Sequence, residues 1–144
     1  MNLCRPMFTL VTHLHLFDFM PIGSGPKMVP WLSFLASLPS LTHLAVIAAV
    51  REASELFASC KKLEVLVNLH GSWGPFPPDN QDLTSVDDAR FVYIRVDWEY
   101  ADDWVIGVNG GMDFWARADA FVAMKRRGEI KPSSRCWIQA EDRI

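Results

Sequence analysis

Charge is scarce in the first third of this 144-residue chain. Only Arg5, Asp18 and Lys27 are charged among the first fifty residues, and the other 28 charged residues come later. A segment so poor in charge is expected to bury most of itself, or to lie against a partner that is not part of this chain. The net charge of −3 argues against general nucleic-acid binding, which needs a basic surface.

Several targeting and covalent signals are also missing. An odd number of cysteines without a CxxC spacing indicates free thiols in a reducing compartment; they are Cys4, Cys60 and Cys136. The apolar run from Met7 lacks a basic start and is interrupted by two histidines and an aspartate, so a signal peptide is not expected. Pro and Gly interrupt residues 21–39, which leaves no stretch able to span a bilayer. We therefore expect a cytoplasmic or nuclear protein with no membrane contact.

What the chain does contain is typical of one globular domain. Half of its residues are apolar and 22% are charged, which excludes a disordered chain. A domain of this length buries roughly 70% of the surface that its unfolded form exposes. We expect residues 1–144 to form a single folding unit.

An apolar pattern of the form Leu-x-x-Leu-x-Leu occurs four times and suggests a stacked repeat. The four copies are Val11-Leu14-Leu16, Leu41-Leu44-Val46, Leu63-Leu66-Asn68 and Phe91-Ile94-Val96, at spacings of 30, 22 and 28 residues. In a strand–helix repeat, one unit cannot bury its apolar side alone, so neighbouring units supply the core. The pattern predicts parallel strands in which Leu14, Leu44, Leu66 and Ile94 are neighbours.

The repeat predicts an irregular α/β solenoid of the leucine-rich-repeat type, with about four parallel strands and helices or loops on the other side. Strands are expected at 9–16, 41–47, 63–69 and 91–96, and helices at 31–38, 52–60 and 114–127. The turn-rich segments 19–30, 70–88 and 97–112 are expected to be loops. The repeats would run near 8–30, 38–60, 60–88 and 88–112, followed by a capping helix at 113–128 and a tail at 129–144.

The last helix has the clearest signals. Asp113 can cap its N-terminus, a run of basic residues suits its C-terminal end, and Gly128 can end it. Its apolar stripe consists of Phe114, Ala118, Phe121 and Val122. We expect this helix to cover the open end of the stack.

Several segments resemble uncharacterised F-box-like leucine-rich-repeat proteins of mushroom-forming fungi. The resemblance is carried by residues 11–18, 38–45, 60–67, 90–92, 113–130 and 136–138. It implies the C-terminal repeat part of a longer protein, which is the substrate-recognition part in F-box-like proteins. Nothing in the chain resembles the F-box helices, so direct binding to a ubiquitin-ligase adaptor is not expected.

The fold predicts a non-enzymatic protein-binding module, with no cofactor and with a protein partner of unknown identity. In a repeat array, the residues between the inward-pointing positions face outward on the strands, where such arrays bind partners. That face would consist of His13, His15, His43, Ala45, Val65, Val67, Tyr93 and Arg95.

The spacing His13-Leu14-His15 leaves a second hypothesis open. On a strand it places two imidazoles on one face, as in metal-dependent hydrolases, with Asp18 and His43 as further candidate ligands. The competing interpretation is that these histidines are exposed strand residues. A third possibility is a truncated copy without a function of its own.

The second half of the chain holds two more candidate features. Residues 79–103 contain eight acidic residues, which favour solvated loops that attract a basic partner over a calcium site. Trp73, Trp98, Tyr100 and Trp104 fall in expected loops, as binding anchors or as ties that hold the loops down. Cys60 is expected to be a buried structural residue rather than a nucleophile.

Overall fold

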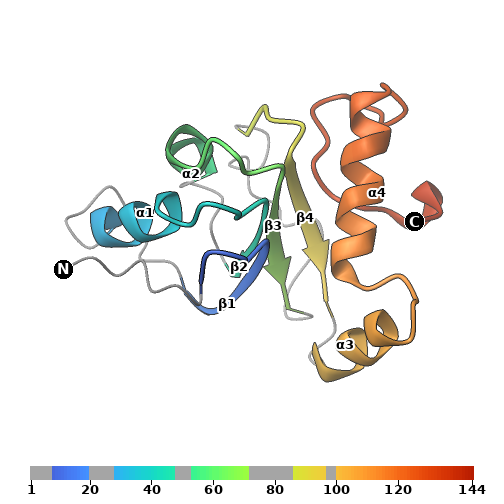
Figure 1. The fold of residues 1–144 in the computed structure, drawn as a ribbon. Helices are drawn as coiled ribbons and strands as arrows, with labels where there is room; N and C mark the ends of the chain where they lie inside the picture. Colours follow the sequence, from blue (N-terminus) through green and yellow to red (C-terminus); the bar gives the residue numbers. More distant parts are fainter. Residues whose placement is uncertain (1–7, 20–27, 48–52, 72–85, 97–99) are drawn as a thin grey trace.

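The computed structural model describes residues 8–19, 28–47, 53–71, 86–96 and 100–144. These residues form a parallel four-stranded sheet with helices on both faces (Figure 1). The strands, in their spatial order, are β1 (His13–Phe19), β2 (His43–Ile47), β3 (Val65–His70) and β4 (Phe91–Arg95). The helices are α1 (Met28–Ala36), α2 (Ala53–Ser59), α3 (Tyr100–Val108) and α4 (Phe114–Arg126). The expected α/β class with four parallel strands is confirmed.

Both faces of β2, β3 and β4 are buried, which explains why these three strands are almost continuously apolar. On one face, Leu44 and Leu66 pack with residues of α1 and α2, including Leu35 and Leu56, and all four are at most 1% exposed. On the other face, Val67 and its neighbours pack against α4. Alternating residues of each strand therefore belong to two separate cores.

The strand register agrees with the repeat for three strands and departs from it at the fourth. Leu14 pairs with Leu44, and Leu44 with Leu66, as expected. Leu66 then pairs with Phe91, whereas Ile94 pairs with Leu69, so the expected alignment of Ile94 is wrong. A shift of three residues is odd, and an odd shift exchanges the two faces of a strand.

Helix α4 also lies in a different place from the one expected. Its apolar stripe is confirmed, since Phe114, Ala118, Phe121 and Val122 are its buried residues. These side chains pack with residues of β3 and β4 and do not cover an end of the stack. Figure 1 shows α4 on the other side of the sheet from α1 and α2. The reason is that the face left open in a repeat array is apolar here, and burying it against a helix is favourable.

Helix α3 lies in a segment expected to be a loop. Residues 100–108 are helical, and the chain leaves the helix at Gly110, whose φ of 76° is a left-handed conformation suited to glycine. The glycines at 110 and 111 were the reason for expecting a loop, but they mark only the end of the element. Figure 1 places α3 below α4 and away from the sheet.

The C-terminal tail closes the outer edge of β4. The backbone N–H of Tyr93 donates to the carbonyl oxygen of Cys136 at 2.6 Å, and Tyr93 forms a parallel bridge with Trp137. Arg135 holds the tail through a paired hydrogen bond to Asp142, at 2.6 and 2.8 Å, with both side chains at most 7% exposed. None of the helices in the described ranges has the length and apolarity to cross a membrane.

Candidate functional site

The strand face expected to bind partners is largely interior. Val65, Val67 and Ala45 are 3%, 0% and 0% exposed because α4 packs on them. The expectation that these residues are exposed is therefore wrong, and their substitution would test stability rather than binding. The physical reason is the stripe of α4, which is complementary to this face.

Tyr93 and Arg95 do not belong to that face at all. Because of the register shift, Tyr93 points into the core shared with α1 and α2, and its hydroxyl lies 3.0 Å from Nδ1 of His70. Burial, with a smaller effect of Cys136, raises the pKa of Tyr93 to about 12. Arg95 is exposed at the end of β4, opposite His70 of the neighbouring strand.

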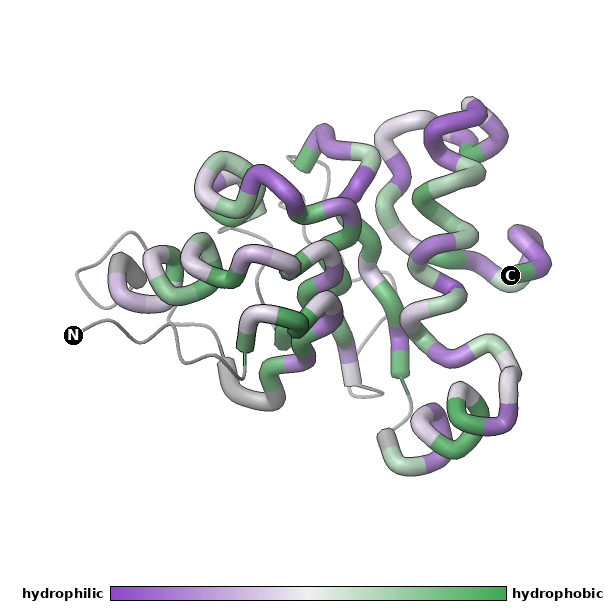
Figure 2. Tube along the Cα trace, viewed as in Figure 1, coloured by the Kyte–Doolittle hydropathy of each residue, from purple (hydrophilic) through white to green (hydrophobic). Residues whose placement is uncertain are grey.

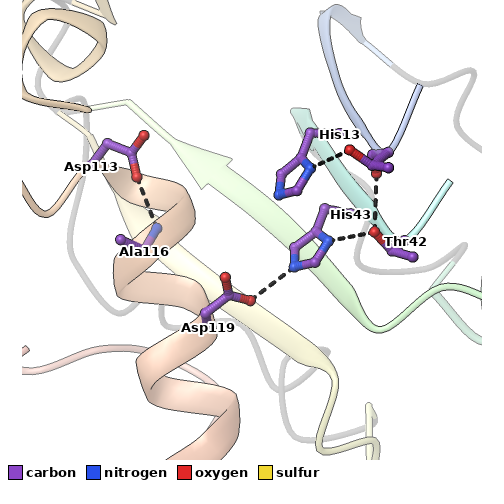
Figure 3. A network of polar contacts seen from close by, with 7 residues as sticks. His13, Thr42, His43, Asp113, Ala116 and Asp119 are labelled. Carbon is purple, nitrogen blue, oxygen red and sulfur yellow. Dashed lines mark hydrogen bonds and ion pairs between the residues drawn. The ribbon is translucent and has the colours of Figure 1, made fainter. Parts of the chain in front are cut away.

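At the β1 side of the same face, two histidines lie next to the first two turns of α4 (Figure 3). The imidazole rings of His13 and His43 are stacked, with centroids 4.1 Å apart and planes 8° from parallel. The indole of Trp115 meets both rings edge-on, at 5.1 Å from His13 and 6.0 Å from His43. The stack follows from the pairing of His13 with His43 in the sheet. The tripeptide Thr-His-Leu, which occurs at 12–14 and again at 42–44, thus has a structural reason.

Polar contacts connect this stack to α4 and to the strand ends. Nε2 of His43 lies 2.8 Å from Oδ1 of Asp119, and its Nδ1 lies 2.8 Å from the hydroxyl of Thr42 (Figure 3). His13 has the equivalent contact with Thr12, at 3.0 Å. A neutral His43 that donates to the carboxylate from Nε2 can accept the Thr42 proton at Nδ1.

The neutral forms of His13 and His15 are favoured. Burial lowers the pKa of His13 and the neighbouring His43 lowers it further, while Asp119 and Asp113 act in the opposite direction. Burial likewise lowers the pKa of His15, whose ring lies against Phe114. The lowered pKa values favour the neutral forms of His13 and His15 at the contact between the sheet and α4.

The order hydroxyl–imidazole–carboxylate in Thr42, His43 and Asp119 is that of an activated nucleophile. Acyl transfer also needs donors for the developing oxyanion. The backbone N–H groups of Thr42 and His43 both donate to the carbonyl oxygen of Thr12, at 3.0 and 2.9 Å, and are not available for this role. We interpret the group as a contact that fixes α4 on the sheet.

The other candidate sites are not assembled in the described residues. His13 and His43 stack face to face instead of converging on one point, and within the described ranges no three possible ligands gather around a metal position. The side chain of Asp18 lies outside what the structure describes. Cys60 is buried, as expected, and burial raises the pKa of its thiol, so that it is not an activated nucleophile.

The acidic run gives no calcium site in its described part. Asp88 pairs with Arg90 at 2.7 Å, and Asp103 pairs with Arg117 at 2.9 Å, while Asp87 and Asp102 are exposed. The remaining four positions, Asp79, Asp82, Asp97 and Glu99, lie outside the described residues, as do Trp73 and Trp98. The described carboxylates are paired or solvated.

Helix α3 presents a different kind of surface. Trp104, Val105 and Val108 are 65%, 58% and 86% exposed, and Ala101 is exposed beside them. At 3.6 residues per turn these four residues lie on one side of the helix. We call them the α3 ridge. Figure 2 shows the hydrophobic residues of α3 on an element that stands apart from the sheet.

The opposite side of α3 is attached to α4 by polar groups. The side chain of Asp103 accepts from the backbone N–H of Phe114 and from the guanidinium of Arg117, both at 2.9 Å. Gly107 lies so close to Asp113 that a Cβ would collide with the carboxylate that caps α4. The usual arrangement of a surface helix is therefore inverted, with its polar side toward the protein and its apolar side toward solvent.

The α3 ridge was missed at the level of sequence, although Trp104 was recognised as a possible anchor. The available signal was the spacing of Ala101, Trp104, Val105 and Val108, together with two aspartates in the first turn that suit a helix N-terminus. Trp104 does not tie a loop down, since most of its surface is exposed. No family model, no curated protein and no solved structure matches the chain.

Proposed function

We propose that this protein is a non-enzymatic protein–protein interaction module and that the α3 ridge is its binding surface. The observation that carries the proposal is the inverted helix: its apolar side faces solvent, and its polar side makes the contacts with α4. Large exposed apolar side chains that cluster on one element are typical of interaction sites. Trp104 supplies the kind of aromatic anchor that dominates binding energy at such sites.

The proposal retains the interaction function expected from the repeat but moves the surface. In a leucine-rich-repeat module, the strand face is open to partners, whereas here α4 occupies it. The parallel strands, with α1 and α2 on one face, are in keeping with an irregular repeat of this type, which resembles the recognition part of F-box-like proteins. Because α4 covers the strand face, we place the proposed binding surface on α3, which lies outside the sheet.

The test compares two exposed apolar residues on different parts of the molecule. Val108 on α3 and Leu10 before β1 are each 86% exposed, so serine replaces an equally exposed residue at either position. Tagged parent, Trp104→Ser/Val108→Ser and Leu10→Ser proteins are used for quantitative affinity purification from the native cell. We expect the α3 variant to lose at least ten-fold of the specifically bound protein, and Leu10→Ser to retain it.

An α3 variant that retained every partner of the parent would contradict the proposal. The comparison is meaningful only if both variants fold, which circular dichroism and the urea midpoint report directly. Because the three side chains are exposed, we expect neither measurement to change.

A further inference from the structure

In the sequence, the segment that contains the α3 ridge carries charge of one sign only. Residues 97–113 contain five acidic residues and no lysine or arginine. Within the described part, Asp102 is exposed next to the ridge, whereas Asp103 is already paired with Arg117. In the described residues, Asp102 therefore gives one flank of the α3 ridge an exposed negative charge.

This charge decides among the possible occupants of an exposed apolar helix. An anionic membrane surface attracts basic segments and repels acidic ones, and amphipathic helices that lie on membranes carry Lys and Arg on their polar side. A second copy in a two-fold arrangement would place the same acidic groups against each other. A partner with basic residues around an apolar groove satisfies both the ridge and its flanks.

We propose that the α3 ridge inserts into an apolar groove on a partner protein whose rim carries lysine or arginine. The inference rests on the proposed interaction function and adds the chemistry of the partner. Helix-in-groove recognition uses anchors on one side of a helix at spacings of three and four residues, and Ala101, Trp104, Val105 and Val108 have this spacing. Trp104 is the expected central anchor, and Asp102 is the expected contact with the rim.

The experiment uses a photo-reactive amino acid at position 108 of the full chain, introduced in the native cell. After irradiation, the cross-linked protein is identified and the cross-linked peptide is located on it. We expect one folded protein, linked at an apolar groove with Lys or Arg on its rim. Cross-links only between copies of this chain, links to an acidic or flat surface, or no cross-link at all would overturn the proposal.

The purified pair then tests the charge directly. Asp102→Lys is expected to weaken binding at least five-fold at low salt, and the loss should shrink as salt screens the rim contact. Glu55→Lys reverses the charge of an exposed residue on α2. It is the matched control and should leave the affinity unchanged. An Asp102→Lys protein that binds like the parent would overturn the partner chemistry.

These outcomes separate the two proposals. If Trp104→Ser weakens the pair and Asp102→Lys does not, the interaction function stands and the basic rim is wrong. If neither substitution weakens the pair, both proposals are wrong. Binding of the chain to vesicles of zwitterionic or anionic lipid, lost in Trp104→Ser, would overturn the protein groove in favour of a membrane.

Discussion

Two consecutive helices, α3 and α4, carry apolar residues at similar helical spacing and place them in opposite environments. In α4, Phe114 and Phe121 are 1% and 0% exposed beneath the sheet face, whereas Trp104 and Val108 in α3 are mostly exposed. The two helices differ in which side, apolar or polar, contacts the rest of the protein. Helix α4 contacts the sheet through its apolar stripe, while α3 contacts α4 through Asp103 and the close approach at Gly107.

The comparison teaches that an apolar stripe in the sequence does not by itself identify a core element. A stripe becomes core when another apolar face of the same chain is available to it. The sheet has two such faces; α1 and α2 contact one and α4 the other. Helix α3 packs on neither face, so its stripe is exposed to solvent. Substitutions in the two helices should then affect different measurements.

The largest effect is expected for Phe121→Ala in α4. Its side chain is fully buried, so truncation loses transfer free energy and leaves a cavity, a loss of about 3–5 kcal/mol in the free energy of unfolding. Urea unfolding monitored by circular dichroism measures it. The matched change in α3, Val108→Ala, should cost at most about 0.5 kcal/mol. Equal losses in the two helices would remove the distinction between them.

A smaller effect is expected where the two helices are connected. Asp103→Ala removes the acceptor for Phe114 N–H and for Arg117, and we expect a loss of about 1–2 kcal/mol. Amide hydrogen exchange should accelerate in residues 100–108 and remain slow in the strands. Asp102→Ala removes an exposed carboxylate of the same helix and is the control. Unchanged exchange in α3 would show that other contacts hold this helix.

The sequence predicts those parts of this comparison that depend on local patterns. The cap at Asp113 and the four-residue stripe of α4 are local patterns, and the structure confirms both. The position of α4 on the sheet face depends on which surface remains open after the strands assemble, and no local pattern contains this. The expected register of β4 is wrong for a related reason. Both faces of that strand are apolar, so either alignment buries apolar side chains.

The sequence predicts even less of the candidate site. Trp104 was identified by its residue type, but the helix around it was hidden by the glycines at 110 and 111, which favour a loop. His13 and His43 were identified as lying on one strand face, and the structure places them side by side. Their partners Trp115 and Asp119 come from more than seventy residues later than His43, and only the folded chain shows that contact.

The histidine contact beneath α4 predicts a modest dependence of stability on pH. Burial lowers the pKa of His13 and His15 in the folded protein, so the unfolded chain binds more protons as the pH falls below about 6.5. The stability contributed by their neutral forms is present at pH 7 and is lost as pH decreases toward the lowered pKa values. Urea midpoints between pH 7.5 and 5.5 should therefore decrease.

Replacing both rings with phenylalanine keeps aromatic contacts and removes the titration. The double variant His13→Phe/His15→Phe should lose less stability than the parent over that pH range. The same slope in parent and variant would show that these histidines do not fix α4 through their neutral forms.

The smallest expected effect is the most informative for α3. Trp104→Ser/Val108→Ser should leave the free energy of unfolding of the isolated protein within about 0.5 kcal/mol of the parent, because exposed side chains lose little on truncation. Serine at two large apolar positions of the α4 stripe would instead lower the free energy of unfolding strongly, because those side chains are part of the core. A loss of roughly 2 kcal/mol or more would mean that the α3 ridge is buried within the isolated protein. An unchanged stability together with lost partner binding is the result that only an external role for the α3 ridge explains.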